Sequence, residues 1–104
     1  MTEALNSRTT VDMAAEFGSA LVSRGDGARA RESVISLATR APLCVDFARV
    51  EMITPGFADE FFARLPAELT DSGRIQIKGL TPPLKLVRRF AMSRTGFDSQ
   101  ASAA

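Results

Sequence analysis

Residues 43–69 read LCVDFARVEMITPGFADEFFARLPAEL, and this stretch decides the fold. Its first part, Leu43 to Phe47, is a short apolar run with a single acid, which predicts a strand. A Thr-Pro-Gly turn at 54–56 leads into four apolar residues spaced four apart: Phe57, Phe61, Leu65 and Leu69. That spacing predicts a helix. A strand that enters a helix through a tight turn places the helix N-terminus at the carboxyl edge of a sheet, where ligands and partners dock.

The flanking sequence alternates strand and helix patterns. The expected elements are a short strand over 11–17, a second strand over 20–22 paired with it as a hairpin, a loop at 25–27, a helix over 28–40 capped by Asp26, a strand over 74–78, a helix over 82–91 and a loop at 95–97. The inward stripe of the last helix is expected to hold Leu84, Leu86, Val87 and Phe90. We therefore predict an α/β fold, a single layer of about four strands in a mixed sheet with three helices.

Length and composition limit the protein to one modest domain. With 104 residues we expect a domain over 9–98, a polar tail over 1–8 and a C-terminal tail over 99–104. No apolar run approaches the roughly 20 residues that cross a membrane, and no secretory signal is visible. The single cysteine, Cys44, falls in a predicted core strand, which is typical of a reducing compartment. We expect a cytoplasmic protein without membrane contact.

Histidine, tryptophan and tyrosine do not occur in the chain. The commonest general base, the commonest zinc ligand and the Ser-His nucleophile pair are thereby excluded. Asp59 and Glu60 are neighbours on the predicted helix and point about 100° apart, so they do not converge on one substrate atom. We expect no catalytic residue, no metal and no cofactor.

The stretch quoted above resembles the core of STAS domains (sulphate transporter and anti-sigma factor antagonist domains) and, more closely, a STAS-like family of unassigned function. Three segments carry the resemblance: Val45-Asp46-Phe47, Val50, and Ile53-Thr54-Pro55-Gly56-Phe57-Ala58-Asp59-Glu60. It extends from the strand near Val11 to Phe97. A typical STAS domain adds a strand after the last helix, which we expect to be absent or very short here.

The resemblance implies a regulatory partner, an anti-sigma-type or histidine-kinase-like ATPase. The residues expected to bind it are Asp46, Thr54, Pro55, Gly56, Phe57, Asp59 and Glu60. In anti-sigma factor antagonists a serine at the start of the second helix is phosphorylated, and that position falls at Gly56, which has no hydroxyl. Thr54 is then the candidate phosphorylation site, although a helix cap is its preferred interpretation. Asp46 is expected to bond turn amides near Pro55.

Two alternatives remain open. The first is a small regulator that binds a nucleotide or another anion through Gly56, Lys85, Arg88 and Arg89. The second is nucleic-acid binding through the basic stretch 74–94, which a net charge of only +1 disfavours. Phe62 lies about 100° from the face of Phe57 and Phe61 and is a contact candidate, but the core is the preferred place for all three.

Overall fold

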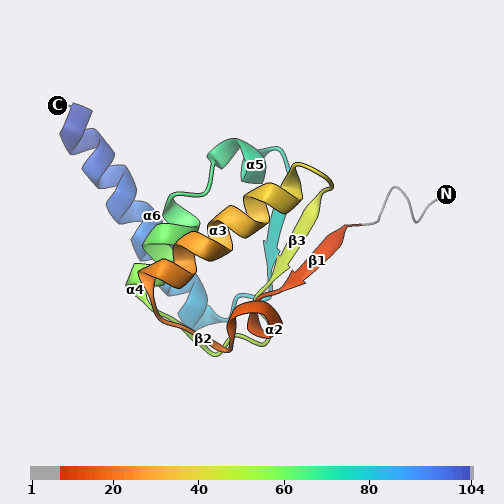
Figure 1. Ribbon diagram of the computed structural model, residues 1–104. Helices are drawn as coiled ribbons and strands as arrows, with labels where there is room; N and C mark the ends of the chain where they lie inside the picture. The colour runs from red at the N-terminus through yellow and green to blue at the C-terminus, as the bar shows by residue number, and fades with distance from the viewer. Residues whose placement is uncertain (1–7, 104) are drawn as a thin grey trace.

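The centre of the fold is a sheet of three parallel strands. A computed structural model describes residues 8–103, and side chains over 8–93; the predicted polar tail over 1–8 lies, apart from Arg8, outside this range. The strands β1 (Thr9–Asp12), β3 (Leu43–Asp46) and β5 (Ile75–Lys78) lie in the order β1–β3–β5. The strand predicted from Leu43 is thus confirmed as the central one (Figure 1).

A second sheet has two strands, which also pair in parallel. β2 (Ala20–Leu21) pairs with β4 (Met52–Ile53), again in parallel. Between β1 and β2 the chain forms the short helix α2 (Met13–Phe17), whose N-terminal amides are capped by Asp12. The predicted hairpin is therefore wrong, because α2 carries the chain onward and β2 meets β4 rather than folding back on β1. The described strands pair only in parallel, not in a mixed sheet.

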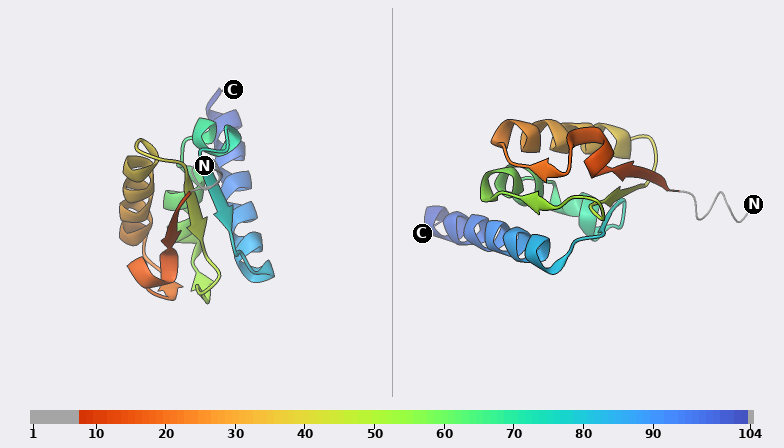
Figure 2. Two further views of the ribbon diagram at one scale, coloured as in Figure 1. Left: turned by 90° about the vertical axis from the view of Figure 1, so that its right-hand side faces the viewer. Right: turned by 90° about the horizontal axis from the view of Figure 1, so that it is seen from below.

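The main helices cover one face of the three-stranded sheet. They are α3 (Arg24–Ala38), α4 (Pro55–Ala58) with the π-helix η1 (Asp59–Ala63), and α6 (Pro82–Ala103). The α4–η1 segment contacts both α3 and α6 and lies between them, as Figure 2 shows. A short helix, α5 (Ala67–Asp71), packs against β5. The α/β prediction is confirmed, but the described helices outnumber the three that were expected.

The register of the sheet separates a buried face from a polar one. Val11, Val45 and Ile77 form one row across the inner face, and Leu43 and Ile75 pair in the row before it. The outer face carries two rows of other residues: Thr10, Cys44 and Gln76, then Asp12, Asp46 and Lys78. The helices pack on the inner rows, since these residues are mostly buried while Gln76 and Lys78 are exposed.

Four phenylalanines fill the space between the sheet and the α4–η1 segment. They are Phe47, Phe57, Phe61 and Phe62, with ring centroids 5.0 to 5.9 Å apart in the contacting pairs. Phe57, Phe61 and Phe62 are all buried, so their preferred place in the core is confirmed. The π-helix η1 contains the consecutive residues Phe61 and Phe62. Single π-helical turns of this kind occur mostly within α-helices.

The helix predicted over 57–69 is interrupted. It ends at Ala63, and a separate helix starts at Ala67. Pro66 explains the break, because proline lacks the amide hydrogen and its ring clashes with the preceding turn of a helix. Only Phe57 and Phe61 of the predicted stripe therefore share a continuous helix, while Leu65 is buried in the connection and Leu69 is half-buried in α5.

The loop predicted at 25–27 is the first turn of α3. Ser23, not Asp26, caps this helix, and its hydroxyl accepts the amide hydrogen of Asp26 at 2.9 Å. Gly27 has a packing role: a Cβ there would lie 2.7 Å from the Phe57 carbonyl oxygen and 2.9 Å from Glu60 Cβ. The two helices can cross this closely only because residue 27 has no side chain.

Helix α6 is longer than predicted. It continues through 95–97, where a loop was expected, and reaches Ala103. Leu84 and Ala91 are buried and Val87 is half-buried, but Leu86 and Phe90 are 49% and 65% exposed. Their predicted inward position is therefore wrong, because the buried stripe runs through Leu84 and Ala91 and leaves these two residues outside it.

Alanine substitutions at Gly25 and Gly27 should have opposite effects on stability. Gly27→Ala should lower the free energy of unfolding by about 1–3 kcal/mol, because the new methyl group overpacks the contact with Phe57. At Gly25 the nearest atom to an added Cβ is 3.9 Å away, so Gly25→Ala should raise it by about 0.5–1 kcal/mol. Urea denaturation measures both, and equal effects would contradict the close crossing.

Candidate functional site

The segment 54–60, which we call the α4 corner, begins with a hydroxyl that is engaged on both sides. Thr54 Oγ1 donates to the carbonyl oxygen of Val22 at 2.9 Å and accepts the amide hydrogen of Phe57 at 3.3 Å. Thr54 is thus the N-cap of α4 and joins that helix to the end of β2. This geometry supports the cap interpretation of Thr54.

The two acids of the α4 corner are occupied by arginines. Asp59 pairs with Arg24 at 3.2 Å. Glu60 lies within 4 Å of three guanidinium groups, those of Arg24, Arg31 and Arg64. Arg31 also donates to the Glu60 carbonyl oxygen, so the network ties α3 to η1. Both side chains are less than a fifth exposed, which leaves these carboxylates little free surface for a partner.

Asp46 stabilises a different turn from the expected one. Its Oδ1 accepts the amide hydrogen of Ala48 at 2.9 Å, in the turn that follows β3, rather than an amide near Pro55. Gly79 packs against the same group, since a Cβ there would lie 2.5 Å from both Asp46 Oδ1 and the Ala48 nitrogen. Asp46 therefore stabilises the turn after β3, and Gly79, directly after β5, can approach that turn closely because it has no side chain.

Several exposed apolar side chains lie on the elements that contact the α4 corner, and most of them were not predicted as site residues. Val22, directly after β2, is 52% exposed and Met52, on β4, is 47% exposed, and Pro55 is exposed at the start of α4. Helix α6 packs against β4 and α4 and adds Leu86 and Phe90. We call these five residues the apolar surface. Phe57 is fully buried and does not belong to it.

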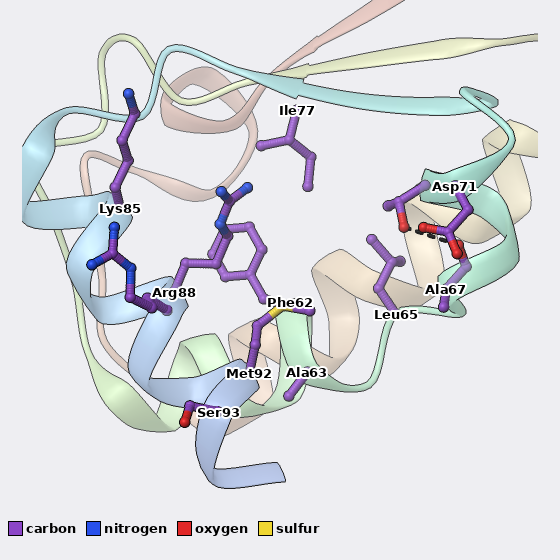
Figure 3. Close-up of a pocket in the computed structure, with 12 residues that line it drawn as sticks. Phe62, Ala63, Leu65, Ala67, Asp71, Ile77, Lys85, Arg88, Met92 and Ser93 are labelled. Carbon is purple, nitrogen blue, oxygen red and sulfur yellow. Dashed lines mark hydrogen bonds between the residues drawn. The ribbon is translucent and has the colours of Figure 1, made fainter. Parts of the chain in front are cut away.

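The second feature is a groove of about 690 Å³ between α6 and the loop after η1, which we call the α6 groove. Its residues are Phe62, Ala63, Leu65, Ala67, Thr70, Asp71, Ile77, Lys85, Arg88, Arg89, Met92 and Ser93. In Figure 3, Arg88 reaches across the groove between Ile77 and Phe62. Its guanidinium carbon lies 6.0 Å from the Phe62 ring centroid, within the range of a cation–π contact.

The predicted anion-binding set divides between these two features. Lys85, Arg88 and Arg89 all line the α6 groove, whereas Gly56 does not. Gly56 lies instead beside Arg24, whose Cγ would be 3.1 Å from an added Cβ. The α6 groove therefore offers cations without the helix N-terminus that was expected to accompany them.

The described residues show no arrangement suited to metal binding. Over residues 8–93, whose side chains are described, no three cysteine or acidic side chains come together as an ion would require. Cys44 is a buried free thiol on the outer face of the sheet. None of the helices in the described part of the chain is both long and apolar enough to cross a bilayer.

The cap at Thr54 can be tested by changing its hydroxyl. Thr54→Ala should lower the free energy of unfolding by about 1 kcal/mol, because the amide of Phe57 and the carbonyl of Val22 both lose their partner. Thr54→Ser keeps the hydroxyl and should retain most of the stability in urea denaturation. If the alanine variant is as stable as the parent protein, the hydroxyl is not a structural cap.

Comparison with known proteins identifies the family. A family model described as "STAS-like domain of unknown function (DUF4325)" matches residues 26–85, more than half of the 104 residues. No curated protein and no solved structure shows a significant match to the chain. The matched region runs from the first turn of α3 into α6 and includes the whole α4 corner. The predicted STAS-like resemblance is confirmed, and the chain belongs to this family of STAS-like domains.

Proposed function

We propose that this chain is a protein-interaction module without catalytic activity, which docks onto a regulatory protein through the α4 corner and the apolar surface around it. The proposed partner class is an anti-sigma-type or histidine-kinase-like ATPase. This class comes from the STAS resemblance, and the geometry of the corner is compatible with protein docking.

One observation carries the proposal. The described residues contain five exposed large hydrophobic side chains, and four of them, Val22, Met52, Leu86 and Phe90, lie on β4, on α6 or directly after β2. These elements meet at the α4 corner, because β2 pairs with β4 and α6 packs against both β4 and α4. Apolar side chains gathered on a rigid surface are typical of protein interfaces.

The proposed interface differs from the one expected from the sequence. Asp59 and Glu60 act within the domain, where they join α3 to η1 through arginines. Pro55 is exposed, and Gly56 is half-buried beside the side chain of Arg24. We propose that the module binds without a phosphorylation switch at position 56, since glycine offers no hydroxyl.

A pair of substitutions on α6 tests this surface. Leu86→Glu combined with Phe90→Glu should abolish capture of an ATPase from a lysate of the native host, because two charges would be buried in the interface. Both side chains are about half or more exposed, so the free energy of unfolding should change little. Tagged protein, mass spectrometry and parallel lanes with and without ATP provide the measurement.

Met92→Glu is the matched control, because Met92 is 51% exposed on the same helix but lines the α6 groove instead. It should retain the ATPase. Capture that survives the double substitution, or capture of no ATPase by the parent protein, contradicts the proposal.

A second candidate function is a regulator that binds a small anion or nucleotide. The observation that favours it is the α6 groove, which gathers Lys85, Arg88 and Arg89 over an apolar floor and has the size of a small-molecule site. Phosphate groups are commonly held by such clusters of cations.

Thermal-shift measurements test the second candidate. Millimolar ATP, GTP or inorganic phosphate should raise the melting temperature, since a ligand that binds only the folded state stabilises it. The combined change Lys85→Glu and Arg89→Glu should remove the shift. Arg40→Glu, in the turn that follows α3, is the charge control and should keep the shift. An unchanged melting temperature with all three ligands rejects this function.

A further inference from the structure

The sheet has an open edge at β5. The carbonyl oxygens of Arg74 and Lys78 point toward β3, because they accept the amide hydrogens of Leu43 at 2.8 Å and of Phe47 at 2.9 Å. Backbone groups of successive residues in a strand point to opposite sides. The amide hydrogens and carbonyls of Ile75 and Ile77 therefore point away from β3, and in the described part of the chain no strand pairs there.

The open part of this edge is centred on Ile77. Ile75 is only 1% exposed, and α5 packs against this end of β5. Ile77 is half-buried, and its neighbours Gln76 and Lys78 are exposed. The connections through α3 and through α4–α5 each move the chain one strand further in the same direction, from β1 to β3 to β5. A further strand added in the same direction would lie beside Ile77, on the open edge of β5.

Hollows lie on both faces of this edge. The α6 groove is on the helix side, and a second hollow of about 520 Å³ includes Cys44, Gln76 and Lys78 from the outer face. The two share four residues: Thr70, Asp71, Ile77 and Arg88. An extended segment beside Ile77 would direct alternate side chains into the two hollows, because successive side chains of a strand point to opposite faces.

The charge around the edge favours an acidic occupant. Lys78 lies on β5, and α6 adds Lys85, Arg88 and Arg89 along the groove. Asp71 is the one acidic residue among those that line the two hollows. Apolar atoms of Leu65, Ile77 and Met92 lie beneath these cations. The surface therefore suits a strand in which aliphatic residues alternate with carboxylates.

We propose that the open edge of β5 binds an extended acidic segment of another protein as an added strand. The segment exchanges backbone hydrogen bonds with Ile77, places aliphatic side chains in the α6 groove and directs the alternate carboxylates into the outer hollow, toward Lys78 and Arg88. Strand addition to an exposed sheet edge is a general mode of peptide recognition. This edge is separate from the apolar surface and does not depend on the docking proposed there.

Peptide binding measured by fluorescence polarisation tests the inference. The probe is a labelled peptide in which valine alternates with glutamate. Two comparison peptides replace glutamate by lysine, or keep the charge and replace the central valine by proline. The alternating acidic peptide should bind at least about tenfold more tightly than either of them. Ile77→Pro should weaken binding by about tenfold or more, since it removes the outward amide hydrogen and leaves the ladder to β3 intact.

Matched variants separate strand pairing from simple attraction. Ile77→Val keeps the amide hydrogen and should bind as the parent protein does. Lys78→Glu, which reverses the charge in the outer hollow, should weaken binding about tenfold or more, whereas Arg40→Glu should not. Equal binding of the proline-containing acidic peptide, or full binding by a folded Ile77→Pro variant, would show attraction without a strand and overturn the inference. Absence of binding at millimolar peptide would also overturn it.

Discussion

The packing of four phenylalanines against the central strand is the interaction on which the rest of the structure depends. Phe47 directly follows β3, and its ring contacts the rings of Phe61 and Phe62 in η1. Phe57 stacks on Phe61 one turn earlier. These contacts fix the axis of the α4–η1 segment over the sheet. The α4 corner at one end of that segment and the floor of the α6 groove at the other are consequently parts of one rigid unit.

The approach of α3 to this segment determines which polar groups remain at the surface. Gly27 allows the helix backbones to touch, and that contact brings Arg24 and Arg31 beside Asp59 and Glu60. Ion pairs that are partly shielded from water keep more of their attraction than exposed ones, so the carboxylates are held within the domain. The surface left around Thr54 then carries the exposed apolar side chains of Val22, Met52 and Pro55 beside Arg24, and we propose that a protein partner uses the apolar ones.

The sequence predicted the parts of the fold that depend on local patterns. The run from Leu43 to Phe47 and the alternation from Arg74 to Lys78 both became strands, because the buried face of a sheet requires apolar residues at these spacings. The helix cap at Thr54 could also be predicted from the sequence, because a threonine followed by proline and a helical apolar pattern is typical of a helix N-terminus. The STAS-like family followed from the same segment.

Features that depend on distant contacts were not predictable in this way. A glycine at 27 reads as a loop residue until Phe57 is known to lie against it, and the two-residue strand β4 is too short to leave a pattern. Leu86 and Phe90 are four residues apart, as in the buried face of a helix. In the folded domain, however, Leu84 and Ala91 are buried, and Leu86 and Phe90 are exposed. A single helix carries several apolar residues, and only its neighbours decide which of them are covered.

Helix α6 separates the two candidate surfaces because of this choice of stripe. With Leu84 and Ala91 turned inward, helical geometry places Lys85, Arg89 and Met92 on one flank and Leu86 and Phe90 on the other. One flank borders the open edge of β5 and is basic, while the other adjoins α4 and is apolar. A rotation of the helix by one residue position would bury part of either set. The burial of Leu84 therefore fixes the chemistry of both surfaces at once, and each can be changed by substitution without disturbing the other.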